Sequence, residues 1–423
     1  MEGIVRMLLP LVLLAIAGCQ SLRVADEGRA GIARFSEGGP RADEYGRMQG
    51  YPTAAIYRPK FFVGTFSHQD QLLEGRNIRR ADTPRRLRRA SAEPVLSYRY
   101  EGEERTIEGY LARNPVTGLL IARDDTILVE RYQYARNDSH RFTSASMAKT
   151  LTSMLIGVAI ADGRIRSLDD VAATYVPDLA DTEYGRTSLR HLLQMSSGVR
   201  FDETYGGASA SDFSRLWIGT VAQDSPGGAS VLKQFNHRSR APGTAFAYSS
   251  AETQVLGLVL ANAVGSTVAD YLRLKIWDPM GAESDASWII DAAGQEATYC
   301  CFNAGLRDYT RLALLLANDG RIGERQIIPK AWIVEATTVA ADRPDMNQVW
   351  SATQFGYGYH TWIFAGQRRM FALIGVHGQA IYIDPTSRLV LVQTAVRLQF
   401  DDPNKETLAL WQGILDSLGS AQK

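Results

Sequence analysis

The chain has 423 residues, of which 45% are hydrophobic and 22% are charged. That length and composition suffice for one large or two modest domains with a sizeable buried core. The 46 basic residues balance 46 acidic ones, which gives a formal net charge of zero. A neutral chain lacks the basic footprint of proteins that bind nucleic acid, so nucleic acid is excluded as the main partner.

The first 19 residues have the pattern of a targeting segment. Arg6 supplies a short positive region, and an apolar run from Leu8 to Ala17 follows it. The run is too short to span a bilayer. It ends in Ile-Ala-Gly-Cys, which resembles a bacterial lipoprotein signal and predicts a lipid on Cys19; the alternative is an ordinary signal peptide. By the same resemblance, the glutamine that follows favours an outer-membrane anchor that faces the periplasm.

Residues 20–95 form an N-terminal extension rich in glycine, arginine and proline. We interpret its basic run as a solvated linker, and contact with anionic lipid headgroups is the alternative. The more apolar stretch 51–66 is expected to pack onto the domain that follows. The basic run consists of Arg76, Arg79, Arg80, Arg85, Arg86, Arg88 and Arg89.

Residues 96–423 have the alternating patterns of a globular domain. Strands near both of its ends, with helices between, predict one sheet assembled from the two ends. The middle, about residues 165–300, is predicted to be a mostly helical insertion. The predicted elements are a hairpin of strands at 119–122 and 126–129, a helix at 146–162, a helix at 188–195, a loop-rich stretch at 198–243, helices at 251–264 and 306–318, strands at 371–376, 380–383 and 389–394, and a helix at 404–418.

Only two cysteines follow Cys19, and they are adjacent: Cys300 and Cys301. A vicinal disulfide is possible, but we predict buried, unpaired side chains that act as small hydrophobes. The six histidines are scattered, and no H-E-x-x-H motif is present. We therefore expect neither a metal nor another cofactor.

The helix predicted at 146–162 begins with Ser146-Met147-Ala148-Lys149. A serine and a lysine three residues apart lie on one helix face, one turn from each other. A desolvated lysine can lose its proton and then accept the proton of the serine hydroxyl. Thr143 or Ser144 is expected to cap this helix and Gly163 to end it. The alternative is an ordinary first-turn serine beside a solvated lysine.

Two other S-x-x-K matches, at Ser230/Lys233 and Ser420/Lys423, are weaker candidates. The pair at 230 follows a Pro-Gly-Gly loop signal, and its apolar pattern breaks within a few residues. The pair at 420 lies at a polar chain end, where fraying is expected. The context therefore favours Ser146.

Two later stretches carry further candidates for a catalytic role. Tyr248 precedes an S-x-x-E capping box at 249–252, which leaves its ring free to project; a hydrophobic staple is the alternative. Val376-His377-Gly378-Gln379 ends one predicted strand, and Gly378 permits close approach by a ligand. His377 alone is as easily a core or turn histidine.

In this order, the three motifs resemble the serine β-lactamase and penicillin-binding superfamily, whose signature is S-x-x-K, a mid-chain S-D-N or Tyr motif, and K-T-G. The chain is most similar to the class C β-lactamase-like branch that includes esterases and 6-aminohexanoate-dimer hydrolase. The resemblance covers about residues 105–418, including the stretches 192–199, 305–308, 326–329 and 356–359. It implies an α/β (α+β sandwich) fold: an antiparallel sheet from both chain ends with helices on its faces, plus a mostly helical subdomain.

The resemblance also implies a two-step acyl transfer. Ser146 would attack a carbonyl while Lys149 and Tyr248 move its proton to the leaving group. Backbone N–H groups of Ser146 and Gln379 would hold the oxyanion. A water would then cleave the acyl-enzyme, with Tyr248 as the base.

The same resemblance gives His377 a place in the wall of the site and Tyr205 a contact with the leaving group. If Gly378 matches the glycine of K-T-G, Val376 replaces the lysine, which disfavours an intact β-lactam. The expected substrates are small esters, short linear amides or D-amino-acid peptides. A non-catalytic envelope lipoprotein that binds a cell-wall peptide or partner is the alternative.

Overall fold

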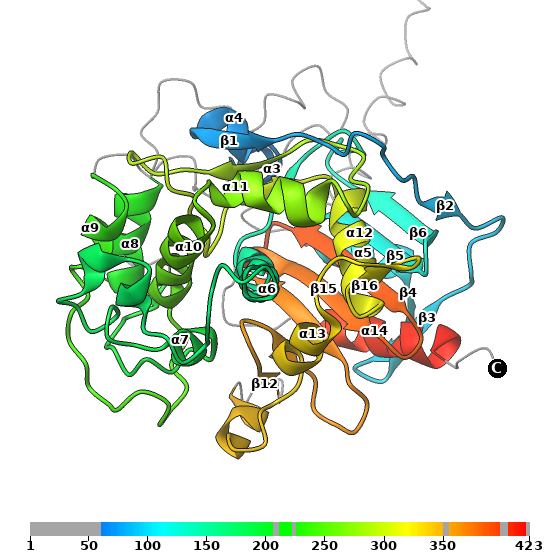
Figure 1. Cartoon of the computed structure of the whole chain (residues 1–423). Coiled ribbons are helices and arrows are strands. Elements are labelled where there is room, and N and C mark those ends of the chain that lie inside the picture. The colour runs from blue at the N-terminus through cyan, green and yellow to red at the C-terminus, as the bar shows by residue number, and fades with distance from the viewer. Residues whose placement is uncertain (1–60, 206–210, 222–225, 350–354, 398–404, 420–423) are drawn as a thin grey trace, which may run out of the picture.

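The computed structural model of the chain describes residues 61–205, 211–221, 226–349, 355–397 and 405–419. Cys19 and the whole targeting segment lie outside these residues. Within them, a large sheet with helices on both faces adjoins a mostly helical region, as expected (Figure 1).

An eight-stranded sheet forms the centre of the fold. Its neighbouring strands are antiparallel except for β2, which pairs with β6 in parallel. Strand β16 pairs with β5, so the two chain ends meet in the middle of the sheet, which confirms the prediction. The order across the sheet is β12 (Gly356–Tyr357), β13 (Trp362–Ile363), β14 (Phe371–Gly375), β15 (Gln379–Asp384), β16 (Leu389–Ala395), β5 (Val116–Arg123), β6 (Thr126–Tyr132) and β2 (Arg88–Arg89).

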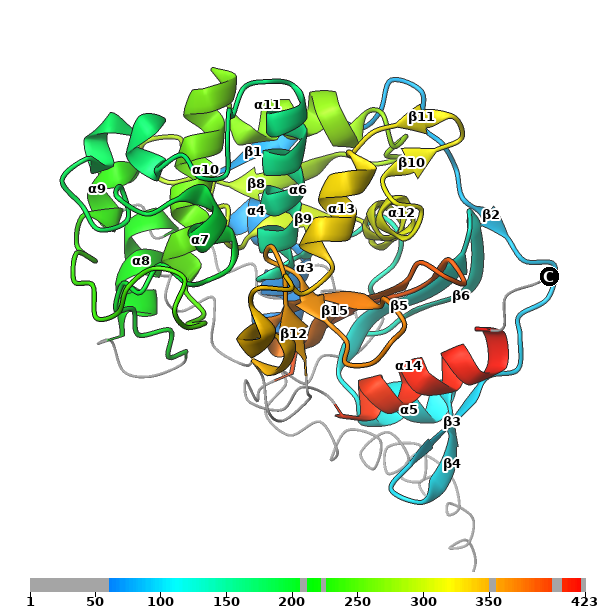
Figure 2. The same ribbon diagram turned by 60° about the horizontal axis from the view of Figure 1, so that its bottom comes forward.

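Alternate residues of each central strand face opposite helical layers, because successive side chains of a strand point to opposite faces. In β5, Leu120 and Ala122 belong to one apolar core, and Leu119 and Ile121 to the other. Figure 2 shows the two layers on either side of the sheet. The first layer contains α6 (Met147–Ala161), α12 (Leu306–Ala317) and α13 (Lys330–Ala336), and the second contains α5 (Ile107–Arg113) and α14 (Lys405–Leu418).

A smaller sheet and a group of helices build the second region. The sheet has the order β1 (Gly75–Ile78), β8 (Ala286–Ile289), β9 (Phe302–Ala304) and β7 (Phe142–Thr143). The stretch 198–243, predicted to be loop-rich, also holds two helices. The helices of this region are α7 (Leu189–Leu193), α8 (Asp212–Thr220), α9 (Ala229–Leu232), α10 (Ser250–Val264) and α11 (Val268–Leu272).

Short elements complete the described chain: α3 (Phe62–Ser67), α4 (Gln69–Leu72), the hairpin β3 (Ser97–Tyr100) and β4 (Glu103–Thr106), the hairpin β10 (Arg321–Ile322) and β11 (Arg325–Gln326), and the turns η3 (Ala172–Thr174), η4 (Pro177–Leu179), η5 (Arg273–Trp277), η6 (Pro344–Gln348) and η7 (Val376–Gly378).

No single helix among the described residues has both the length and the apolar character to cross a membrane. One bent pair of helices, 250–264 and 268–277, has the required length and apolar character only when its two parts are counted together.

The described part of the extension is built into the fold. Strand β1 pairs with β8, and β2 pairs with β6. Arg76 forms an ion pair with the buried Glu296 at 3.1 Å, and Arg88 pairs with Asp125 at 2.5 Å. The interpretation of this basic run as a solvated linker is therefore wrong, because its backbone completes two sheets and several of its guanidinium groups neutralise carboxylates of the domain.

The two adjacent cysteines differ from expectation in one respect. Cys300 and Cys301 are buried, as predicted, but they form a vicinal disulfide. Cys301 has a φ of 64°, so the bond coincides with a turn in the left-handed region. This turn directly follows Tyr299, whose carbonyl contributes to the candidate site.

Candidate active site

Ser146 lies at the N-terminus of α6, a helix that lies between the large sheet and the helical region (Figure 1). It is itself the N-cap residue, and its side chain makes no capping hydrogen bond. Ala145, just before it, has a φ of 44°, which turns the chain sharply into the helix. The expected caps act elsewhere: Thr143 donates to Gln69, and Ser144 accepts from the N–H of Phe302. The Ser146 hydroxyl is thus left for other partners at the positive end of the helix dipole.

Lys149 is fully buried and reaches the serine one turn earlier. Its Nζ donates to Ser146 Oγ at 3.0 Å and to the carbonyl oxygen of Tyr299 at 3.0 Å. Burial lowers the pKa of this lysine to about 8, and the negative charge of Glu203 opposes that shift. A large fraction of the lysine is therefore neutral near pH 8 and able to accept a proton. This geometry contradicts the alternative of a solvated lysine.

Tyr248 lies just before α10, with its ring above the same lysine. Lys149 Nζ is 5.0 Å from the ring centroid. Desolvation and the charge of Glu203 raise the pKa of Tyr248 far above its usual range, and only its hydrogen bond with Ser146 opposes this rise. The phenol therefore stays protonated at neutral pH. The ring stacks on Trp362 at 5.8 Å, so residues distant in sequence fix its direction.

The expected capping box beside Tyr248 does not form. Ser249 is the N-cap of α10 but makes no side-chain capping bond. Glu252 instead accepts a hydrogen bond from Ser197 Oγ at 2.7 Å. Burial raises the pKa of Glu252 to about 8. This glutamate joins α10 to the preceding loop.

Glu203 is a site residue that the sequence reasoning missed. Its carboxylate accepts from the Tyr205 hydroxyl at 2.6 Å and from the N–H of Ser250 at 2.8 Å. Its charge acts on both Lys149 and Tyr248, and desolvation raises its own pKa. Tyr205 is thus near the centre, but its hydroxyl is engaged by Glu203. The only sequence signal was the position of Glu203 two residues before Tyr205.

A backbone turn after β14 meets the N-terminus of α6, and here the structure corrects the sequence hypothesis. A Cβ atom built on Gly375 would lie 3.0 Å from Ser146 N and 2.7 Å from the carbonyl oxygen of Ser144. The backbone that reaches the serine is therefore at Gly375 and Val376, three residues before Gly378 and Gln379.

The predicted residues 377–379 have neighbours other than Ser146. A Cβ on Gly378 would meet the side chain of Arg397 at 2.9 Å, so the close approach there is not by a ligand. Gln379 bonds through its side chain to both backbone groups of Ala395. The His377 ring packs against the stacked rings of Phe62 and Phe66. Burial lowers the pKa of His377 to about 4, which keeps the imidazole neutral.

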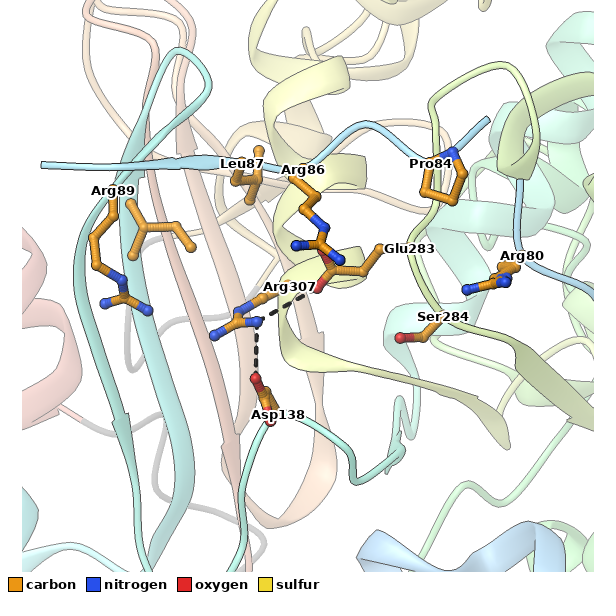
Figure 3. Close-up of a pocket in the computed structure, with 10 residues that line it drawn as sticks. Arg80, Pro84, Arg86, Leu87, Arg89, Asp138, Glu283, Ser284 and Arg307 are labelled. Carbon is orange, nitrogen blue, oxygen red and sulfur yellow. Dashed lines mark ion pairs between the residues drawn. The ribbon is translucent and has the colours of Figure 1, made fainter. Parts of the chain in front are cut away.

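A pocket of about 700 Å³ lies elsewhere, between the extension and the domain (Figure 3). Arg307 crosses its floor and pairs with Asp138 at 2.8 Å and with Glu283 at 3.8 Å. None of its lining residues contacts the serine, the lysine or Tyr248. Within the described residues, no group of three or more His, Cys, Asp or Glu side chains could hold a metal ion.

Comparison with known proteins agrees with this geometry. The sequence profile of the Beta-lactamase family matches residues 104–412. A 6-aminohexanoate-dimer hydrolase from Paenarthrobacter ureafaciens is 26% identical over 319 residues, which cover 73% of this chain and 78% of that protein.

Solved structures support the same fold. A candidate 6-aminohexanoate-dimer hydrolase from Bacillus anthracis superposes with a TM-score of 0.75 at 21% identity, over 86% of this chain and 96% of that chain. EstCE1, a hydrolase with promiscuous acyltransferase activity, superposes with a TM-score of 0.56 at 16% identity, over 73% of this chain and 96% of its own. These likenesses confirm the fold expected from the motifs.

Proposed function

The chain belongs to the beta-lactamase family and is a serine hydrolase, and from this premise we propose that Ser146 forms an acyl-enzyme with a small amide or ester. The observation that carries the proposal is the 3.0 Å contact between Lys149 Nζ and Ser146 Oγ. The lysine is buried, and its lowered pKa of about 8 makes it a competent base.

In the first step, Ser146 Oγ attacks the carbonyl carbon and the hydroxyl proton moves to neutral Lys149. Collapse of the tetrahedral intermediate breaks the bond to the leaving nitrogen or oxygen. Tyr248 donates its proton to that atom and regains one from the lysine ammonium. This route differs from the expectation that Tyr248 is a base, because a phenol with a strongly raised pKa is a donor at neutral pH.

In the second step, a water takes the place of the leaving group. Lys149, neutral again, removes a proton from this water as it attacks the acyl carbon. The tetrahedral intermediate then releases the acid, and the lysine returns the proton to Ser146 Oγ. Lys149 is thus the base in both steps, and the two steps together regenerate the free enzyme.

Two backbone N–H groups are suited to stabilise the oxyanion of each intermediate: those of Ser146 and Val376. The contact of Gly375 with Ser146 N supports this pair over the pair with Gln379. Such donors, fixed in advance, typically contribute about 10²–10³ in kcat each.

The substrate is proposed to be an ester or a linear amide rather than a β-lactam. With Gly375 as the glycine next to the serine, the position of the K-T-G lysine falls on Leu373, which is buried and apolar. The sequence hypothesis matched Gly378 to the glycine of K-T-G, which puts Val376, also apolar, at the lysine position. With either glycine, the site lacks the lysine that would hold a substrate carboxylate.

A paired labelling experiment tests the proposal. Wild type and Ser146→Ala are incubated with a fluorophosphonate probe and, separately, with a fluorescent penicillin. We expect fluorophosphonate labelling of wild type only. Penicillin labelling would indicate a penicillin-recognising enzyme, whereas labelling by neither would overturn the proposal in favour of the non-catalytic binding protein.

We also propose that the protein is anchored in the cell envelope by a lipid on Cys19. The Cys300–Cys301 disulfide supports an oxidising compartment. Metabolic labelling with a palmitate analogue tests the anchor. Wild type should incorporate label and sediment with membranes, and Cys19→Ser should do neither; a labelled Cys19→Ser variant would refute the assignment.

A further inference from the structure

The turn that follows β14 packs against side chains that lie outside the family match at 104–412. Its first residue, Val376, is the proposed oxyanion donor. Since Gly375 lies against Ser146 N, a small movement of the turn alters the distance between the two N–H groups. The rigidity of this turn therefore matters for the transition state.

His377, in the middle of the turn, has φ 65° and ψ 16°. The left-handed region is unfavourable for a residue with a Cβ, and such residues persist where their surroundings determine them. Two hydrogen bonds with Arg397 help to hold His377 in this conformation. His377 Nδ1 bonds to the carbonyl oxygen of Arg397 at 2.6 Å, and the N–H of Arg397 donates to the carbonyl oxygen of His377 at 3.0 Å.

Helix α3 supplies a further constraint. The centroid of the His377 ring is 4.8 Å from that of Phe62 and 5.0 Å from that of Phe66, both edge-on. The two phenyl rings stack on each other at 5.1 Å. All three side chains are buried, and Val63 and Val396 are also buried against this group.

The segment that carries these rings is also fixed to the strand before the nucleophile. Gln69 accepts a hydrogen bond from Thr143 at 2.8 Å, three residues before Ser146. Asp70 forms an ion pair with Arg141 at 2.6 Å. Residues 62–70 thus contact both sides of the candidate oxyanion site.

We propose that α3 is a clamp: Phe62 and Phe66 hold the ring of His377 and thereby fix the Val376 N–H in its position as oxyanion donor. The inference rests on the proposed acyl transfer. His377, Phe62 and Phe66 are positioning residues, because the buried imidazole packs against α3 and acts on the reaction through the turn that it belongs to.

Kinetics of the full-length protein test the clamp. The double variant Phe62→Leu/Phe66→Leu keeps an apolar core but removes both rings. We expect kcat for a small ester, corrected for active sites by fluorophosphonate titration, to fall about 10- to 100-fold with KM changed less than about threefold. Val63→Ala, in the same helix and core, is the matched control and should keep kcat within about twofold. An equal loss in Val63→Ala would overturn the proposal.

A double-mutant cycle separates the clamp from general destabilisation. His377→Gly removes the ring but tolerates the left-handed turn. If the phenyl rings act through the imidazole, the triple variant should lose no more activity than His377→Gly alone. Multiplying losses would mean that the phenyl rings act independently of His377, which refutes the clamp.

Hydrogen exchange provides a readout that does not depend on catalysis. Amides of residues 371–380 should exchange faster in the double leucine variant than in wild type and Val63→Ala. Unchanged exchange would refute the clamp even if wild type hydrolyses esters. Conversely, an inactive wild type would refute the proposed function, while faster exchange would still support the structural restraint.

Discussion

Two walls meet at Ser146, and they are held in different ways. The helix wall carries Ser146 and Lys149 on one turn of α6, so the helix geometry itself brings their side chains together. The strand wall is the turn at Val376–Gly378, whose conformation depends on Phe62 and Phe66, far away in the sequence. In the proposed mechanism, the pairing of nucleophile and base is thus encoded locally, whereas oxyanion stabilisation depends on a distant segment of the chain.

The largest expected effect lies on the helix wall. Lys149→Met keeps most of the side-chain volume but removes the base, so kcat/KM for an activated ester should fall roughly 10³-fold or more. Lys233→Met is the matched control: Lys233 belongs to another S-x-x-K match, but it is exposed and should be silent. Comparable losses of kcat/KM in the two variants would contradict the assignment of Lys149, rather than Lys233, as the base.

The next prediction concerns Tyr248, above the lysine. Tyr248→Phe should slow hydrolysis of a linear amide about 10²-fold or more, because an amine leaving group needs a proton. A nitrophenyl ester, whose leaving group needs none, should lose less than about tenfold. Steady-state kinetics on both substrates test this prediction. Equal losses of activity on the amide and the ester would instead support Tyr248 as the base in deacylation.

The pH dependence provides a smaller, directional test. Lys149 must be neutral to act, so kcat/KM should rise with pH through a midpoint near 8, the lowered pKa of this lysine. Glu203 raises that pKa by stabilising the ammonium form, so Glu203→Gln should move the midpoint to lower pH. A shift to higher pH, or no dependence between pH 6 and 9, would contradict this account of the helix wall.

The smallest expected effect concerns stability and lies at Glu252, which is buried in α10. Its pKa in the folded protein is raised to about 8, so the folded state holds a proton that the unfolded chain releases near pH 4.5. Stability should therefore decline as pH rises from about 5 to 8. In thermal melts, Glu252→Gln should lose less of its melting temperature over this range than wild type; parallel curves would argue against a protonated Glu252.

The elements that the sequence predicted correctly are those with strong local periodicity. The hairpin at 119–129, the helices at 146–162 and 251–264, and the three C-terminal strands all agree with the structure within a few residues. Pairing of Ser146 with Lys149 was likewise predictable, because three residues in a helix fix the distance.

Features that depend on distant contacts were not predictable in the same way. Glu203 enters the site through its bonds to Ser250 and Tyr205, which the fold brings together. The sequence hypothesis used Gly378 and did not consider Gly375, because the glycine that lies next to the serine cannot be identified until the register of β14 and β15 is known. The two strands of the extension were not recognised, because they are short and pair with partners far along the chain. The extension was therefore interpreted as a linker.

The pairing of β5 with β16 has a consequence for biosynthesis. Strand β5 is buried along nearly its whole length, yet its partner residues, 389–395, follow far later in the chain. The ribosome therefore releases most of the chain before the central sheet can close, and the early hairpin exposes an apolar edge throughout that time. Folding of the central sheet is therefore non-local: the strand that completes it is synthesised long after the hairpin that it joins.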